Sequence, residues 1–413
     1  MLLASFLAAL PASTEEPYRQ TLVSVERNVH VTDWDVDGRT VTPDCPFNWS
    51  VKTRRLKGGK QDGVDVILVN NGATTIVVVP TRGMGIWEVV HGDVRLGWQS
   101  PVNEIVHPGH VNLSARGGIG WLEGFGEWLC RCGLESNGAP GIDTIIDNTG
   151  AESQVQLNLH GRIAYEPAQE VELVVERKPP YRITVRGTVN ERMMFGPNLQ
   201  LMTEISTEAG SASLQVDDTV TNRGGLPSEF QLLYHVNFGP PILGAGSQLA
   251  APFQLVRPFN AHAEASILQF SEYGPPEAGF VEQVYCVRLF GDEDDNTKVV
   301  LHNADRDKGA AMSFSLKTLP YLTIWKNTST LKDGYVTGIE PGTNYPNNRS
   351  HERKAGRVPK LKPDEKYQTS IKIDILANGK EVAAATDDVT KIQAGRQERI
   401  ETLSNDGLSG ADE

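Results

Sequence analysis

Three short segments each place a titratable side chain beside glycine, proline or asparagine, where an expected strand ends. They surround His160 (NLHGR), His235 (LYHVNFGPP) and Glu340 (GIEPGTNYPN). Such positions carry functional groups more often than strand centres do. A histidine titrates at about pH 6.5, and burial raises the basicity of a glutamate, so both can exchange protons near neutrality. If the three side chains converge, the set predicts acid–base chemistry on a neutral polyol.

Several other polar or aromatic residues are candidates for binding that substrate. Arg82 follows an apolar run and Pro80-Thr81, which fits either a cleft arginine or a surface one. Trp325 ends an expected strand and would stack on a sugar face, or else belong to the core. Glu123 lines either a cleft or a solvated helix face. The full set of candidates is Arg82, Glu123, Arg131, Arg162, Asn237, Trp325, Lys326 and Asn344.

Neither a metal nor a cofactor is predicted. Two histidines and a carboxylate can form a facial metal site, but nothing in the spacing of His160, His235 and Glu340 requires one. His107 and His110 bracket a turn without a third ligand nearby. The four cysteines (Cys45, Cys130, Cys132 and Cys286) form no Cys-x-x-Cys pair and no disulfide framework, so we expect buried free thiols.

The elements that must position these residues are mostly strands. Alternating, β-branched runs between turn signals predict strands at 64–69, 75–79, 155–159, 170–175, 181–189, 214–220 and 368–375. The 40 glycines and 24 prolines fit many tight connections, and no fixed-period repeat occurs. The sequence predicts an all-β chain with two large antiparallel sheets stacked as a sandwich.

One segment departs from the strand pattern. In 120–133 (GWLEGFGEWLCRCG) the apolar residues follow helical spacing, which predicts a short helix or helical loop lying over the sheets, although two interior glycines weaken it. No linker is expected within the sandwich domain, 21–380. Residues 1–20 form an N-terminal extension and 381–413 a polar C-terminal tail.

Charge and hydropathy exclude two classes of partner. The net charge is −13, with 52 acidic and 39 basic residues, which argues against a nucleic-acid binder. No apolar run reaches the ~18 residues that a membrane helix needs. The apolar start, MLLASFLAALPAS, is similar to a short secretory signal that lacks its basic region, so export to a periplasm and a cytoplasmic location both remain open.

The three segments, in this chain order, resemble the signature regions of the aldose 1-epimerase (galactose mutarotase) family. The segment at His160 resembles Leu-His-Gly-Gly, that at His235 resembles His-x-Tyr-Phe-Asn-Leu, and that at Glu340 resembles Glu-Pro-x-x-x-x-Pro-Asp. The likeness spans roughly residues 60–376 and includes the opening hairpin with Arg82. The sequence departs from the family pattern at Arg162, at 236–241 and at Asn347. In these departures it resembles an uncharacterised subfamily, so the resemblance does not identify the substrate.

The resemblance implies a large β-sandwich of the galactose-mutarotase type and a mechanism without cofactor. Glu340 would act as general base on the anomeric hydroxyl, His235 as general acid on the ring oxygen, and His160 would contact the sugar. The expected partner is a sugar or sugar acid, bound by a monomer or homodimer. Two alternatives stay open, namely a lyase or epimerase on an oxidised sugar, which would use Arg82, Arg162 and Tyr234, and a carbohydrate-binding protein without turnover.

Overall fold

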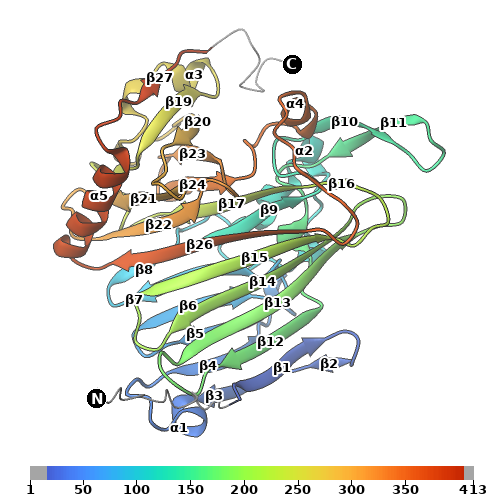
Figure 1. Cartoon of the computed structure of the whole chain (residues 1–413), viewed down its shortest axis with the longest axis vertical. Helices are drawn as coiled ribbons and strands as arrows, with labels where there is room; N and C mark the ends of the chain where they lie inside the picture. Colours follow the sequence, from blue (N-terminus) through green and yellow to red (C-terminus); the bar gives the residue numbers. More distant parts are fainter. Residues whose placement is uncertain (1–15, 404–413) are drawn as a thin grey trace, which may run out of the picture.

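The computed structural model describes residues 16–403, and two large, mainly antiparallel β-sheets dominate it (Figure 1). The ten-stranded sheet contains, in spatial order, β18 (Gln248–Ala250), β21 (Asn296–His302), β22 (Gly309–Ser315), β26 (Lys366–Leu376), β15 (Ser213–Asn222), β14 (Asn198–Glu208), β13 (Arg182–Arg192), β12 (Glu170–Val175), β1 (Tyr18–Ser24) and β2 (Val29–His30). The thirteen-stranded sheet contains β27 (Arg399–Ile400), β19 (Phe253–Pro258), β20 (Gln283–Leu289), β23 (Tyr321–Asn327), β24 (Val336–Gly342), β17 (Gln231–Phe238), β9 (Leu129–Leu134), β7 (Gly85–His91), β6 (Thr74–Val79), β5 (Asp65–Asn70), β4 (Ser50–Arg55) and β3 (Asp35–Asp37), with β8 (Val94–Leu96) paired to β7. The predicted all-β sandwich is confirmed.

Smaller elements surround the two sheets. Two further strand pairs are β10 (Gly141–Ile146) with β11 (Glu152–Leu157), which projects from the body in Figure 1, and β16 (Ser228–Glu229) with β25 (Lys360–Leu361). The α-helices are α1 (Gly38–Val41), α2 (Ala115–Gly118), α3 (Ala261–Glu264), α4 (Arg349–Lys354) and α5 (Gly379–Gln393). The 3-10 helices are η1 (Gly59–Gln61), η2 (Pro108–His110), η3 (Gly120–Gly124), η4 (Ile163–Tyr165) and η5 (Ile267–Gln269).

The main core lies between the sheets and follows from strand alternation. Strands β12 and β13 alternate buried and partly exposed residues, as strands do when one face packs and the other meets solvent. Inward residues of both sheets, such as Val185 and Ile339, belong to one apolar cluster. In contrast, all eight residues of β17 are buried. Loops and short helices therefore cover the outer face of the thirteen-stranded sheet, and a second apolar cluster with Trp121 and Phe125 lies there.

The helix predicted over 120–133 is wrong in its second half. Only Gly120–Gly124 is helical, as η3, whereas Leu129–Leu134 is strand β9 in the middle of a sheet. A central strand is buried on both faces, so its apolar residues do not alternate, and a short apolar run of this kind is ambiguous by periodicity alone.

The two ends of the described chain both pack on the sandwich. Helix α5 begins after Asn378, whose side chain accepts hydrogen bonds from two backbone N–H groups, and it buries Val382, Ala385 and Val389 against β21 and β22. The segment predicted as a polar tail, 381–413, includes most of this helix and β27, and its last ten residues lie outside the described residues. Of the predicted extension 1–20, residues 1–15 also lie outside them. Within residues 16–403, no helix is long and apolar enough to cross a membrane.

Candidate functional site

Strand register brings His235 and Glu340 together, although 105 positions separate them in the sequence. Strands β17 and β24 are antiparallel neighbours, and Leu233 pairs with Gly342 while Asn237 pairs with Gly338. His235 and Glu340 lie midway between these pairs and therefore face each other across the ladder, on the same side of the sheet. This side is the outer, covered face of the thirteen-stranded sheet.

The two side chains form a close and nearly dry pair. His235 Nε2 lies 3.2 Å from Glu340 Oε1, and the two side chains are 5% and 2% exposed. On its other side, the imidazole Nδ1 lies 2.7 Å from Asn237 Oδ1. The proton-carrying groups are therefore within direct transfer distance of each other, and one ring nitrogen is held by a partner.

His160 completes the group of three that the sequence predicted. It precedes Gly161 and has a left-handed backbone (φ 58°), which turns the chain after β11 towards the site. Its Nδ1 donates a hydrogen bond to the carbonyl oxygen of Asn137 at 2.9 Å. The centre of its ring lies 5.3 Å from that of His235. The Asn137 side chain exchanges two hydrogen bonds with Asn344, which supports the loop that holds His160.

Aromatic rings surround the His235 imidazole. Its ring centre lies 5.0 Å from that of Phe125, 6.0 Å from Trp121 and 5.4 Å from Trp325. Trp325 stands on β23, and its indole N–H donates to the exposed Glu282 at 2.9 Å. Trp121 and Phe125 come from η3 and the residue that follows it. Sequence reasoning named Trp325 but took Trp121 and Phe125 only as apolar residues of a helix, because nothing local shows which face they cover.

Three buried polar atoms near this group have no hydrogen-bond partner among residues 16–403. They are Glu340 Oε1, Trp121 Nε1 and Thr323 Oγ1. Thr323 pairs with Glu340 in the β23–β24 ladder and so lies on the same face. Native proteins leave few buried polar groups unpaired, and each exception calls for an explanation. A polar ligand bound between these side chains would supply both the acceptors and the donors.

Burial shifts the proton affinities of the three titratable groups towards their neutral forms. It raises the pKa of Glu340 well above its ordinary value, and the negative charge of Glu282 adds to this. It lowers the pKa of His235 well below the ordinary value, with a further contribution from His160, while Asn237 acts in the opposite direction. Burial also lowers the pKa of His160 to about 4. Each of these shifts favours the uncharged form of its group.

Arg82 does not contact the site, and its placement differs from the sugar contact predicted for it. It is 1% exposed and pairs with Glu127 at 2.5 Å, with its Cζ 4.4 Å from the ring centre of Tyr165. Its other nitrogens donate to the carbonyl oxygens of Val106 and Gly124. The guanidinium group therefore fastens the η3 segment, which carries Trp121, to the sheet.

Arg131 and Lys326 also differ from prediction, because each points to the other face of its strand. Neighbouring Cys130 and Trp325 face the site, so Arg131 and Lys326 cannot. Arg131 is fully buried between the two sheets and forms two hydrogen bonds with Asp218, at 2.7 and 3.0 Å. Lys326 donates to the carbonyl oxygens of Gln269 and Glu272, and burial lowers its pKa to about 8.

The remaining candidates lie outside the His235–Glu340 pair. Asn237 and Asn344 are buried and hold His235 and Asn137, respectively. Arg162 is exposed and pairs with Glu166 at 3.1 Å. Glu123 is exposed on η3. Among residues 16–403, no three His, Cys, Asp or Glu side chains are arranged to hold a metal ion.

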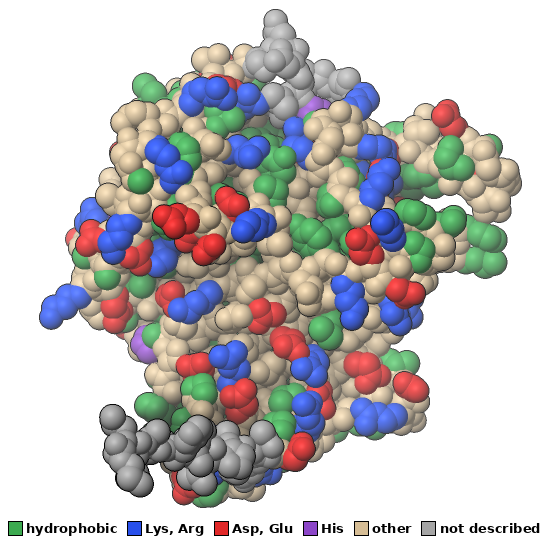
Figure 2. Space-filling view, in the orientation of Figure 1, with side chains coloured by type: hydrophobic (Ala, Val, Ile, Leu, Met, Phe, Trp, Pro, Cys, Tyr) green, Lys and Arg blue, Asp and Glu red, His purple; other side chains and the backbone are tan. Residues whose placement is uncertain are grey.

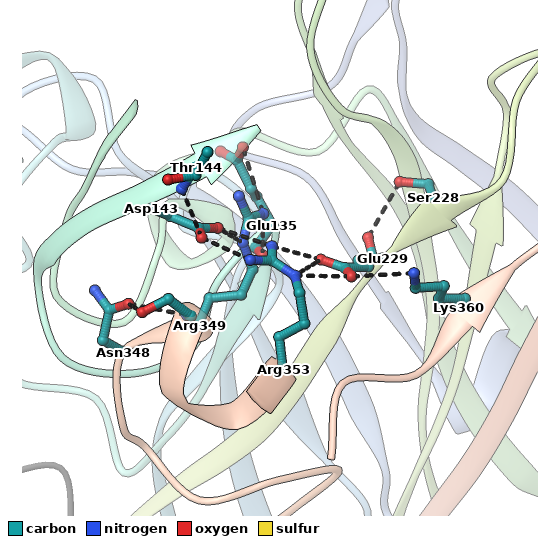
Figure 3. A network of polar contacts seen from close by, with 10 residues as sticks. Glu135, Asp143, Thr144, Ser228, Glu229, Asn348, Arg349, Arg353 and Lys360 are labelled. Atoms are coloured by element: carbon teal, nitrogen blue, oxygen red, sulfur yellow. Dashed lines mark hydrogen bonds and ion pairs between the residues drawn. The ribbon is translucent and has the colours of Figure 1, made fainter. Parts of the chain in front are cut away.

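A separate polar network lies beside the projecting β10–β11 pair (Figure 3). Asp143 on β10 is buried and accepts from both Arg349 and Arg353 of α4, and Arg353 also pairs with Glu229 at 2.7 Å. The carboxylates and guanidinium groups of this network are paired with one another, which fits an anchor for α4 better than a reactive site.

Figure 2 shows acidic and basic side chains interspersed over the face it draws.

Comparison with known proteins places this geometry in a family. The model of a domain of unknown function (DUF4432) matches residues 61–375. A proposed aldose 1-epimerase from Klebsiella pneumoniae is 35% identical in sequence, and the match covers 94% of this chain and 98% of that protein with a TM-score of 0.88. No curated protein matches the sequence.

Two more distant structures share the fold alone. A galactose mutarotase-like protein from Clostridium acetobutylicum is 14% identical over 83% of this chain and 98% of its own, with a TM-score of 0.53. The galactose 1-epimerase of Lactobacillus acidophilus is 12% identical over 79% of this chain and 98% of its own, with a TM-score of 0.51. The resemblance to aldose 1-epimerase and galactose-mutarotase-like proteins is thereby confirmed at the level of fold.

Proposed function

The chain belongs to the DUF4432 family, and we propose that it is an aldose 1-epimerase that interconverts the anomers of a neutral aldose. The observation that carries this proposal is the contact of His235 Nε2 with Glu340 Oε1 at 3.2 Å. Opening a pyranose ring requires removal of a proton from the anomeric hydroxyl and delivery of a proton to the ring oxygen. Both oxygens are bonded to the same carbon, so two adjacent proton carriers can serve them without a cofactor.

The surroundings of the pair support a sugar as the substrate. Trp325, Trp121 and Phe125 offer apolar ring faces on which the C–H face of a pyranose can stack. Trp121 Nε1 is a donor, and Thr323 Oγ1 is both donor and acceptor, for sugar hydroxyls. The Klebsiella pneumoniae relative, itself described as a proposed aldose 1-epimerase, agrees with this choice.

The charges near the site favour a neutral sugar over a sugar acid. Arg82 and Arg131 are buried in ion pairs with Glu127 and Asp218, so their charges are already compensated. Glu282, next to Trp325, adds negative charge at the site. An anionic substrate would therefore meet repulsion without a compensating cation.

The same contacts weigh against a lyase acting on an oxidised sugar. Such an enzyme needs a charge neutraliser for the carboxylate and a tyrosine acid near the substrate. Tyr234 instead faces the core between the sheets, where its hydroxyl donates to Asp218 at 2.7 Å. Arg82 is buried behind η3, and Arg162 is exposed and paired with Glu166.

Anomer exchange measured by NMR on a panel of sugars tests the proposal. We expect faster exchange of neutral aldoses, and not of uronic acids or sugar phosphates. His235→Asn and Glu340→Gln should each lower kcat by about 10²–10⁴-fold, the usual contribution of an acid–base group. Matched controls at exposed positions, His262→Asn and Glu293→Gln, should leave the rate unchanged.

Two outcomes would contradict the proposal. Binding of a sugar without any acceleration of exchange would identify a carbohydrate-binding protein. An unsaturated product that absorbs in the near ultraviolet, formed from a uronide, would identify a lyase.

A further inference from the structure

Large apolar side chains are exposed around the projecting β10–β11 hairpin. Figure 2 shows hydrophobic side chains gathered at this edge of the molecule, on the hairpin labelled in Figure 1 and beneath it. Monomeric proteins rarely expose contiguous apolar patches larger than roughly a few hundred Å², and larger ones mark contact sites. The residues that we call the apolar patch come from β10, the β13–β14 turn and the loop before β16, and each is half to four-fifths exposed; they are Ile142, Ile146, Met193, Met194, Phe195 and Leu226.

Part of the apolar patch lines a hollow of about 770 Å³ between the hairpin and the body of the protein. Ile146 belongs to the hairpin side of this hollow, whereas Phe195 and Leu226 belong to the body. Twenty residues line the hollow, which is close to the roughly 20–30 that each partner contributes to a standard protein–protein interface. The hollow is therefore large enough to receive an element of a protein.

The turn between β13 and β14 holds an aromatic residue where the backbone does not favour one. Phe195 has a φ of 62° and is 66% exposed. A bulky residue seldom adopts this left-handed conformation, and glycine or asparagine is usual at such a turn position. An exposed ring adds little to the stability of the monomer. Burial of the Phe195 ring against another molecule would offset the cost of its backbone conformation.

Ion pairs fix the hairpin to the body at its base (Figure 3). Asp143 on β10 lies 2.5 Å from Arg349 Nε and 2.7 Å from Arg353 Nη1, both on α4. Within residues 16–403, β10 and β11 pair only with each other, and their buried residues are Asp143 and Leu157. A two-stranded hairpin is only marginally stable by itself in water. The ion pairs therefore hold out a protrusion that is ordered before binding, and such a protrusion loses little conformational entropy when it binds.

The hairpin and the hollow differ in the charge that they expose. Residues 141–157 contain three acidic residues and no lysine or arginine, and Glu152 at the start of β11 is exposed. The body side of the hollow carries Arg353 and Lys360, whose side chains are 33% and 66% exposed. Both pair with Glu229, which is only 16% exposed, so the basic groups are the more accessible ones. An acidic hairpin therefore matches a hollow with basic side chains on its wall.

We propose that this surface joins two copies of the chain, with the hairpin of each copy seated in the hollow of the other. In a two-fold dimer the same surface serves both partners, so it must carry both the element that inserts and the hollow that receives it. Here the hairpin and the hollow adjoin each other, share the apolar patch and expose opposite charge. A different protein would require only one of the two. The inference goes beyond the proposed function and does not depend on it.

The state of association of the full chain tests this inference, measured by sedimentation velocity and light scattering over a wide range of protein concentration. We expect a dimer that dissociates on dilution. Ile146→Asp and Leu226→Asp each place an unpaired carboxylate in the contact, and the two-fold axis repeats it, so each should raise the dissociation constant by at least about 100-fold. The matched control Leu268→Asp, at a residue 74% exposed outside the apolar patch, should leave the dissociation constant unchanged. All three positions are exposed, so the variants should fold.

An exchange of charges tests how the two copies meet. Glu152→Lys and Lys360→Glu should each weaken the dimer by about tenfold, because each places like charges opposite one another twice in the contact. The double variant should regain most of the lost affinity, whereas two independent effects would add in free energy.

Three results would overturn the inference. A chain that stays monomeric at every concentration would leave the apolar patch to another molecule or to another part of the same chain. A dimer that survives both Ile146→Asp and Leu226→Asp would use a different surface. A double charge variant that associates more weakly than either single variant would show that the hairpin does not meet the hollow. None of these results depends on anomer exchange, so the proposed function is tested separately.

Discussion

Gly338 is the residue whose substitution tests the placement of the carboxylate most directly. It lies two positions before Glu340 on β24, on the same face, and opposite Asn237. A Cβ added at this position would stand 2.3 Å from Glu340 Oε1 and 3.2 Å from His235 Cε1. Its backbone is not in the left-handed region. Gly338→Ala should therefore be compatible with the strand, while its methyl group collides with Glu340 Oε1.

The size of the effect follows from these distances. Because real Cβ contacts are essentially never shorter than 3.0 Å, the carboxylate oxygen must move by at least about 0.7 Å. A displacement of about 1 Å in a reacting group costs up to roughly 10²-fold, so kcat/KM should fall by about 10–100-fold. The atom that yields is the end of a flexible side chain, and alanine is favoured over glycine in a strand by about 0.5–1 kcal/mol. The free energy of unfolding should therefore stay near that of the unaltered protein.

A double-mutant cycle separates this mechanism from a general disturbance. Glu340→Asp shortens the side chain and withdraws the carboxylate from the added methyl group. Gly338→Ala should then have little further effect on the anomer-exchange rate in the Glu340→Asp background, whereas independent effects would multiply. The reasoning is refuted if Gly338→Ala retains the full exchange rate, or if it lowers the rate equally in both backgrounds. Urea unfolding checks that stability is retained.

Three further predictions concern the pH dependence of the exchange rate, the contribution of Trp325 to sugar binding and the ion pairs that hold α4. Burial lowers the pKa of His235 and raises that of Glu340, so the pair should keep a single proton at pH values where an exposed histidine titrates. We therefore expect kcat/KM to be independent of pH around pH 6.5. A change in the slope of kcat/KM at about pH 6.5 would contradict this expectation. Trp325→Leu should raise KM by about tenfold, which corresponds to the loss of roughly 1.4 kcal/mol of stacking, with kcat nearly unchanged. An unaltered KM in the same assay would show that Trp325 does not bind the sugar. Arg353→Ala should lower the free energy of unfolding in urea by about 1–3 kcal/mol at pH 7, because it takes a partner from buried Asp143. Burial raises the pKa of Asp143, but the two arginines lower it by more, so the net shift is downward. The arginines therefore stabilise the folded protein above the unfolded-state pKa of Asp143, and this stabilisation disappears as the pH falls through the folded-state pKa. The deficit of the variant should shrink in acid, and a constant deficit would show that charge is not its source.

Residue types were enough to name candidate groups in the sequence, whereas the direction of each side chain could not be predicted from them. His160, His235 and Trp325 lie together in the structure, next to the glutamate at 340. Arg131 sits beside residues that face the site, but strand alternation turns it into the core between the sheets. The sequence did not show that 129–134 is a strand, so it could predict neither the direction of the Arg131 side chain nor its partner. Trp121 was visible in the sequence, but its role depends on where η3 packs.

The sequence by itself determined the fold class, because β-branched alternation and turn residues act over a few positions. It also named the titratable residues that are candidates for chemistry, because their three segments are distinctive when read alone. Only the tertiary structure decided which atoms meet. The register of β17 against β24 sets the contact of imidazole with carboxylate, and a shift of one residue would have turned the whole of β17 to the other face. The network from Arg82 through Glu127 to Asn237 likewise exists only after distant segments pack. Burial, which lowers the pKa of His235 and raises that of Glu340, is a property of that packing and of no single residue.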